Sequence, residues 1–181
     1  MNTPLEHSMM HSVLFPPRSS TAGSKVQENL LLQRVIKYQL DDSVELMDSP
    51  IVIFDFETTG LDKNEDEIIE IGAIKLLKGK IVDQYSTLVK PSKPISEVIS
   101  KLCGITNEML DDAPDVADVW LDFLTFFEGN VLFAHNAEFD MSFLWSTSTK
   151  LGYQMQWPAV CTLKMARQIL PDLPSKSLDA L

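Results

Sequence analysis

The stretch IVIFDFETTG, Ile51 to Gly60, decides the fold that we predict for this chain of 181 residues. Four apolar residues run into two acids, Asp55 and Glu57, and the run then breaks at a Thr-Thr-Gly sequence. A continuous apolar run that ends in turn residues is typical of a central strand buried on both faces. The two acids are two positions apart, so both side chains project from the same face of this strand.

Strand-like and helix-like segments alternate from Ser49 onward, which predicts an α/β fold. In chain order we predict a strand at Ile51–Glu57, a hairpin formed by Glu67–Leu77 and Lys80–Pro91, helices near Ser96–Leu102 and over Val116–Phe127, a strand at Asn130–Asn136, a helix over Ala137–Gly152, a short strand entering a helix within Pro158–Leu170, and a last helix capped by Ser177. This order implies a three-layer domain around a mixed five-stranded sheet.

Residues 1–48 are predicted to form an extension, and residues 49–181 the domain. The first 23 residues lack periodicity and are expected to be mostly disordered. A helix is predicted over Ser24–Leu40, because Ser24 and Gln27 have the spacing of a capping box and apolar residues follow at helical intervals. Whether this helix packs on the domain or docks a partner stays open.

Composition narrows the class of protein. The chain is 45% hydrophobic, which fits a globular core, and nothing in it approaches the roughly 20 apolar residues that span a bilayer. Its start does not resemble a secretion signal, and Cys103 and Cys161 are too far apart for a disulfide framework or a zinc knuckle. We therefore expect a protein of the cytoplasm with no membrane partner.

The formal net charge of −11 argues against a protein that grips duplex nucleic acid through broad phosphate neutralisation. It does not exclude a nuclease, because metal ions held by carboxylates can supply the positive charge. Six lysines between Lys75 and Lys101 form a local exception, which fits either a solvated hairpin or a path for nucleic acid.

Carboxylates carry the candidate chemistry. Asp55 and Glu57 would repel each other on a buried strand unless a divalent cation compensates them. Asp140 falls in the first turns of a later helix and can point back toward the same strand end. Three such acids suit Mg²⁺ or Mn²⁺ and form the core of a two-metal phosphoryl-transfer site. His135 alone is more typical of a hydrogen-bonded structural histidine, and Phe139 of a core residue.

The segments DFETTG, HNAEFDMSFL and CTLKMARQILPDLPSKSLDAL occur in this order, and together they resemble the DEDDh-type 3′–5′ exonuclease family. This family includes the proofreading epsilon subunit of bacterial DNA polymerase III. LCGITNEMLDDAP resembles the family's middle segment, and the likeness runs from about Pro50 to Leu181. It implies a ribonuclease-H-like fold and metal-dependent hydrolysis of the 3′-terminal phosphodiester of single-stranded nucleic acid. The family uses both DNA and RNA, and of the two we expect DNA. Whether the domain works with a DNA polymerase subunit as its partner or trims ends alone stays open.

The resemblance also implies roles for single residues. It makes Asp55, Glu57 and Asp140 the catalytic acids and the ligands of Mg²⁺ or Mn²⁺. The residues implied to meet the terminal nucleotide or to lie around the scissile end are Thr58, Thr59, Gly60, Leu61, His135, Asn136 and Phe139.

One family motif has no counterpart in the printed sequence. In the family, a His followed about four residues later by an Asp comes shortly after the segment that matches SLDAL, and the chain as given stops at Leu181. The resemblance makes that His a general base and that Asp a metal ligand. A C-terminally truncated nuclease domain is one expectation, and a non-catalytic module that binds nucleic acid or protein is the alternative. His7 and His11 are poor substitutes for the base, because a mobile tail does not preorganise catalysis.

Overall fold

The computed structural model describes residues 49–154 and 157–181. The predicted N-terminal helix Ser24–Leu40, the disordered start and the histidines His7 and His11 lie outside these residues. The elements are β1 (Ile51–Thr58), β2 (Ile68–Leu77), β3 (Lys80–Leu88), α2 (Glu97–Cys103), α3 (Asn107–Leu110), α4 (Val116–Phe127), β4 (Val131–Ala134), α5 (Glu138–Lys150), β5 (Ala159–Cys161), α6 (Thr162–Ile169) and the 3₁₀ helix η2 (Leu178–Ala180).

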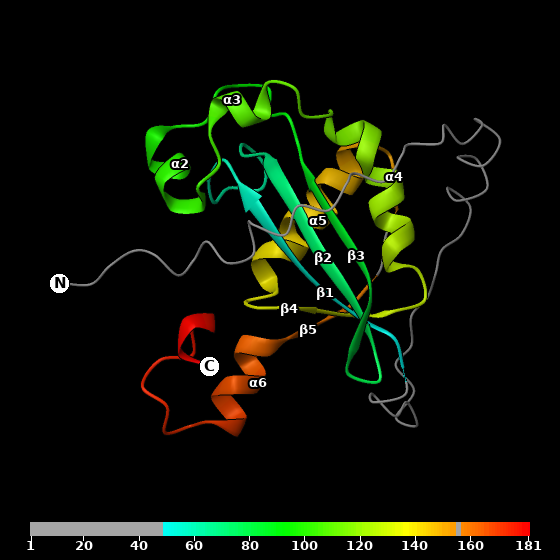
Figure 1. The fold of residues 1–181 in the computed structure, drawn as a ribbon, viewed down its shortest axis with the longest axis vertical. Helices are drawn as coiled ribbons and strands as arrows, with labels where there is room; N and C mark the ends of the chain where they lie inside the picture. The colour runs from blue at the N-terminus through cyan, green and yellow to red at the C-terminus, as the bar shows by residue number, and fades with distance from the viewer. Residues whose placement is uncertain (1–48, 155–156) are drawn as a thin grey trace.

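The five strands form one mixed sheet in the order β3-β2-β1-β4-β5 (Figure 1). β1 pairs antiparallel with β2, and β2 pairs antiparallel with β3, through a turn in which Lys78 and Gly79 both have positive φ angles. β1 pairs in parallel with β4, and β4 with β5. The predicted α/β class and the mixed five-stranded sheet are therefore confirmed, with β1 at the centre.

The main hydrophobic core lies on one face of the sheet. Val52, Phe54 and Phe56 of β1 point into it, and helices α4 and α5 supply aromatic and aliphatic side chains that pack against them. Trp120 Nε1 of α4 donates a hydrogen bond to Ser148 Oγ of α5 at 3.0 Å, so the two helices are joined inside the core. This pair of helices fixes the orientation of α5 over the sheet.

The sequence predicts that β1 is buried on both faces, and this prediction is wrong. Val52, Phe54 and Phe56 are at most 4% exposed, whereas Ile51 and Ile53 on the other face are half-buried and Asp55 is exposed. The reason is that α4 and α5 both pack on the first face. The apolar run therefore has one buried face and one open face, and the two acids lie on the open one.

Most predicted elements agree with the structure to within a few residues. The exceptions are α3, a four-residue helix that was not predicted, and the last helix, which is a short 3₁₀ turn after Ser177. Figure 1 shows α2 and α3 grouped beyond the tip of the β1 arrow, where they border the end of the sheet that carries the acids. Within the described residues, no helix has the length and apolar content needed to cross a membrane.

The core predicts a clear stability difference between two positions. Phe123 is 0% exposed and touches the rings of Phe56, Trp120 and Phe127, so Phe123→Ala should lower the free energy of unfolding by about 3–5 kcal/mol. Val98 on α2 is 74% exposed, and Val98→Ala should change the free energy of unfolding by less than about 0.5 kcal/mol. Urea unfolding of both variants checks this; similar losses would contradict the described core.

Candidate active site

The alternation of β1 places Asp55 and Glu57 on the open face of the sheet, on either side of the buried Phe56. Asp55 is exposed and lies opposite Gly72 of β2, which has no side chain to cover it. Glu57 is half-buried and lies directly opposite Glu70. The strand register therefore places both acids on one face of the sheet, as the sequence predicts.

β1 extends beyond its partner β4, and this leaves backbone groups free for other partners. The last β1 residue paired with β4 is Ile53, opposite Phe133. Phe56 lies past the end of that ladder, and its amide donates a hydrogen bond to Asp140 Oδ1 at 3.1 Å. Because a buried N–H group requires a partner, Asp140 takes the place that another strand would occupy. The hydrogen bond ties α5 to the backbone between Asp55 and Glu57.

Asp140 is the most deeply buried acid of the group, with 1% of its surface exposed. The pKa of its carboxyl group is raised to about 7, mainly by burial, then by the negative charge of Asp55, with a smaller effect from Glu57. The hydrogen bond from the Phe56 amide acts in the opposite direction. The three predicted acids are thus close enough to influence one another electrostatically.

Glu70 is a fourth carboxylate at this site that the sequence analysis missed. It faces Glu57 across the β1–β2 pair, where like charges directly opposite each other are unfavourable. Cys103 at the end of α2 is buried beside them: burial raises the pKa of its thiol, and the charges of Glu57 and Glu70 add to that effect. The alternation of side chains along β2 could have predicted that Glu70 lies on the polar face of this strand. Its position opposite Glu57 follows only from the register between the two strands.

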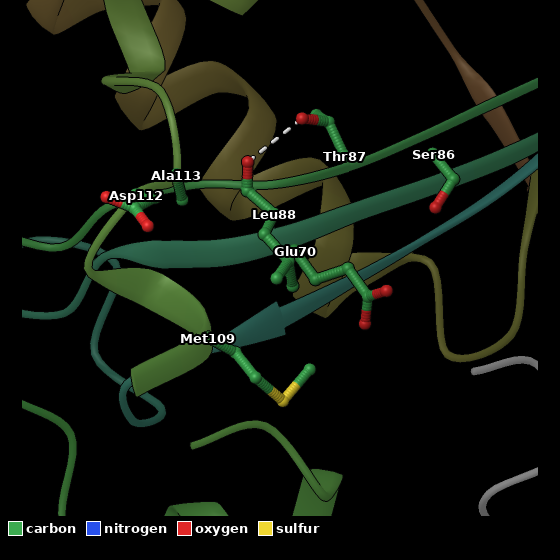
Figure 2. Close-up of a pocket in the computed structure, with 7 residues that line it drawn as sticks. All are labelled: Glu70, Ser86, Thr87, Leu88, Met109, Asp112 and Ala113. Atoms are coloured by element: carbon green, nitrogen blue, oxygen red, sulfur yellow. Dashed lines mark hydrogen bonds between the residues drawn. The ribbon is translucent and has the colours of Figure 1, made fainter. Parts of the chain in front are cut away.

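Glu70 also lines a shallow pocket of about 370 Å³ between the sheet and α3 (Figure 2). Its other lining residues are Ser86, Thr87 and Leu88 of β3, Met109 of α3, and Asp112 and Ala113 after it. None of the predicted site residues lines this pocket. Glu70 is therefore the residue that connects the pocket to the acids at the end of β1.

The Thr-Thr-Gly turn begins at Thr58, the last residue of β1, directly after a register irregularity between Glu57 and Thr58. Thr58 is buried, and its hydroxyl donates to the Gly60 carbonyl at 2.6 Å. Leu61 lies next in the chain and is 86% exposed. Irregularities of this kind often redirect a strand beside a functional site, and here the chain leaves the sheet immediately after the two acids.

The segment between β4 and α5 contains the other predicted residues. His135 Nδ1 lies 3.0 Å from Thr162 Oγ1, so the ring is held by α6, as expected of a structural histidine. Asn136 is exposed and has φ +58°, a left-handed conformation that Asn tolerates better than most residues. Phe139 is half-buried with its ring 5.0 Å from that of Phe143. The roles predicted for these residues stay predictions.

In the parts of the chain that the structure describes, no three His, Cys, Asp or Glu side chains are already arranged so that they could hold a metal ion. The donor chemistry nevertheless fits a cation. Asp55, Glu57 and Asp140 are hard oxygen donors, and the raised pKa of Asp140 reflects negative charge crowded into a buried position. A divalent cation would relieve this crowding.

Comparison with known proteins identifies the family. The RNase_T exonuclease model matches residues 52–181. The PolC-type DNA polymerase III of Caldanaerobacter subterraneus subsp. tengcongensis is 43% identical over 152 residues, which cover 80% of this chain and 11% of that polymerase. The PolC-type DNA polymerase III of Thermotoga maritima is 45% identical over 152 residues, which cover 83% of this chain and 11% of that polymerase. The chain thus spans only a small part of these relatives.

A solved structure agrees with the sequence relatives. Exonuclease X in complex with 5′ overhanging duplex DNA has a TM-score of 0.59 and 34% sequence identity, and the match covers 72% of this chain and 70% of that one. The ribonuclease-H-like fold and the family resemblance that the sequence predicts are therefore confirmed.

The pKa of Asp140 predicts how stability depends on pH in metal-free protein. The folded state keeps the Asp140 proton up to about pH 7, whereas the unfolded chain loses it near the ordinary value of 3.8. The free energy of unfolding should therefore fall by about 4 kcal/mol as pH rises from about 4 to 7, and then level off. Asp140→Asn should remove this dependence.

Urea unfolding between pH 4.5 and 8 in EDTA measures the effect. The matched control is Glu65→Gln, which removes one carboxylate from an exposed loop position and should leave the wild-type slope intact. Parallel pH profiles for wild type and Asp140→Asn would contradict the assignment to Asp140.

Proposed function

This chain belongs to the exonuclease family, and from that premise we propose that it is a metal-dependent 3′–5′ exonuclease domain that acts on single-stranded DNA. We propose residues 49–181 as the nuclease unit and residues 1–48 as an extension to it. The reaction is hydrolysis of the 3′-terminal phosphodiester with release of a nucleotide.

One observation carries the proposal: the buried carboxylate of Asp140 is hydrogen-bonded to the β1 backbone between Asp55 and Glu57. A fold does not gain stability by crowding three acids at one strand end, because burial and like charge both disfavour their ionised forms. Such an arrangement is expected where the acids have a function. The C-terminal end of a central strand is also where open α/β sheets place their sites.

The three acids would hold the cation, Mg²⁺ or Mn²⁺. When bound, divalent cations at this site would stabilise the negative charge that develops on the attacking and leaving oxygens during phosphodiester hydrolysis. Asp140 contributes a carboxylate whose position is fixed by the Phe56 amide. Asp55, which is exposed, contributes a carboxylate accessible to both cation and substrate. Ion binding requires Asp140 to lose its proton, so binding should strengthen above about pH 7.

The residues around the acids would orient the 3′ end of the nucleic-acid strand. Leu61 and the Thr58–Gly60 turn lie beside the end of β1, and Phe139 lies one residue before Asp140 on α5. We assign the terminal nucleotide to this region. DNA is the proposed substrate because the polymerases that match this chain are DNA polymerases, and for the same reason we propose work beside a polymerase.

A nuclease assay tests the proposal. With Mn²⁺ and a single strand labelled at its 5′ end, the chain should produce a ladder of shortened, labelled products. Asp55→Ala and Asp140→Ala should each lower the rate by about 100-fold or more, because each removes a cation ligand. An RNA strand of the same sequence should be cut more slowly.

The control is Glu65→Gln, an exposed carboxylate in the adjacent loop, which should keep the wild-type rate. Release of the 5′ label as a mononucleotide would mean that the chain degrades the strand from its 5′ end, which is the opposite polarity. Products that form equally with wild type and with both acid variants would come from a contaminant and would contradict the assignment of the site.

A further inference from the structure

The loop that follows β1 is organised by Asp66, a residue outside the predicted site. Thr59 Oγ1 donates a hydrogen bond to Asp66 Oδ1 at 3.0 Å, and the Asp62 amide donates to Asp66 Oδ2 at 2.9 Å. Both oxygens of the carboxylate are therefore bonded within the loop. Asp66 joins the start of the loop to its middle.

Thr59 is fixed from its other side as well. The Glu67 amide donates to Thr59 Oγ1 at 3.0 Å, and the Thr59 amide donates to the Glu67 carbonyl at 2.9 Å. The Thr59 hydroxyl thus donates to Asp66 and accepts from Glu67. A residue without this hydroxyl could not make both bonds.

The Asp66 carboxylate also explains why residue 60 is a glycine. A Cβ atom at Gly60 would lie only 2.6 Å from Asp66 Cγ, a separation that real Cβ atoms essentially never show. Gly60 does not have a positive φ angle, so its backbone conformation does not require glycine. The close packing of Asp66 against the Gly60 backbone is what excludes a side chain.

The outer part of the same loop is fastened to α5. Ser146 Oγ donates to the Lys63 carbonyl at 2.8 Å, and Lys150 Nζ donates to the carbonyls of Lys63 and Asn64 at 3.3 Å. α5 also carries Asp140, which is bonded to β1. The loop is therefore held in a fixed position relative to the acids.

Leu61 is the residue that this loop presents. It follows Gly60 directly, and its side chain is 86% exposed. Covering this exposed side chain with an apolar surface of a ligand is favourable, because it removes apolar area from water. The flat face of an unpaired base is a suitable covering surface, and because every base has such a face, the contact would tolerate any sequence.

We propose that Asp66 is a positioning residue that holds the Thr59–Leu61 turn so that Leu61 packs against the base of the 3′-terminal nucleotide. Asp66 acts through Thr59 and Gly60 rather than by touching the substrate. This inference rests on the proposed function for the identity of the ligand. Its mechanical part, the control of Leu61 by Asp66, is separable from hydrolysis.

Binding of a strand with a non-hydrolysable 3′-terminal linkage tests this separately from catalysis. Fluorescence anisotropy in Ca²⁺ compares a strand that ends in a normal nucleotide with one that ends in an abasic residue. Asp66→Ala and Leu61→Ala should each weaken binding of the normal strand about tenfold, and the double variant should be no weaker than either single variant. Neither change should affect the abasic strand, which has no terminal base.

Two control variants sharpen the result. Asp66→Asn keeps an oxygen for the Asp62 amide and can donate to Thr59, so it should restore most of the affinity. Glu65→Gln removes a charge from the same loop and should bind like wild type. The melting temperature of each variant, measured by circular dichroism, must exceed the assay temperature.

Unchanged affinity in Asp66→Ala would overturn the inference, as would equal weakening on both strands, since equal weakening reports a general structural loss. Independent, multiplying effects of Asp66→Ala and Leu61→Ala would also overturn it. If the chain binds as expected but does not hydrolyse single strands with Mn²⁺, the proposed function fails and the positioning role of Asp66 stands.

Discussion

The hydrogen bond from the Phe56 amide to Asp140 is the interaction on which the rest of the site depends. It exists because β1 is longer than β4: the parallel ladder ends at Ile53, and the buried N–H group beyond it must find another acceptor. An acid at the start of α5 provides that acceptor. As a result, the helix, the central strand and the two acids on the open face have one fixed arrangement, although 84 residues separate Phe56 from Asp140.

This arrangement has an electrostatic cost. Asp140 is buried beside Asp55 and Glu57, and its pKa is raised to about 7. Glu70 adds a further carboxylate opposite Glu57. An apolar residue at position 140 would avoid the cost but would leave the Phe56 amide without an acceptor. The site therefore exchanges folding stability for a group of acids suited to a divalent cation, which is a common relation between stability and activity in enzymes.

The period of two along β1 was enough to predict that Asp55 and Glu57 share a face, and the helical spacing of apolar residues in Val116–Phe127 was enough to predict α4. Pairing across strands was not predictable, because the register of Glu70 against Glu57 depends on how two distant segments align. The resemblance implied that Gly60 is among the residues around the terminal nucleotide. The described loop supplies a reason for the glycine itself, the Asp66 carboxylate, and a contact between residues six positions apart in an irregular loop leaves no periodic signal.

The claim that the acids at the end of β1 form a cation site is tested most directly by Mn²⁺ binding, followed by electron paramagnetic resonance as the signal of free Mn²⁺ decreases. At pH 8, wild-type chain should remove Mn²⁺ from solution. Asp55→Asn and Asp140→Asn should bind much more weakly, while Glu65→Gln should bind like wild type. Binding that is unchanged in Asp55→Asn and Asp140→Asn would contradict the account, because the ion would then be held elsewhere.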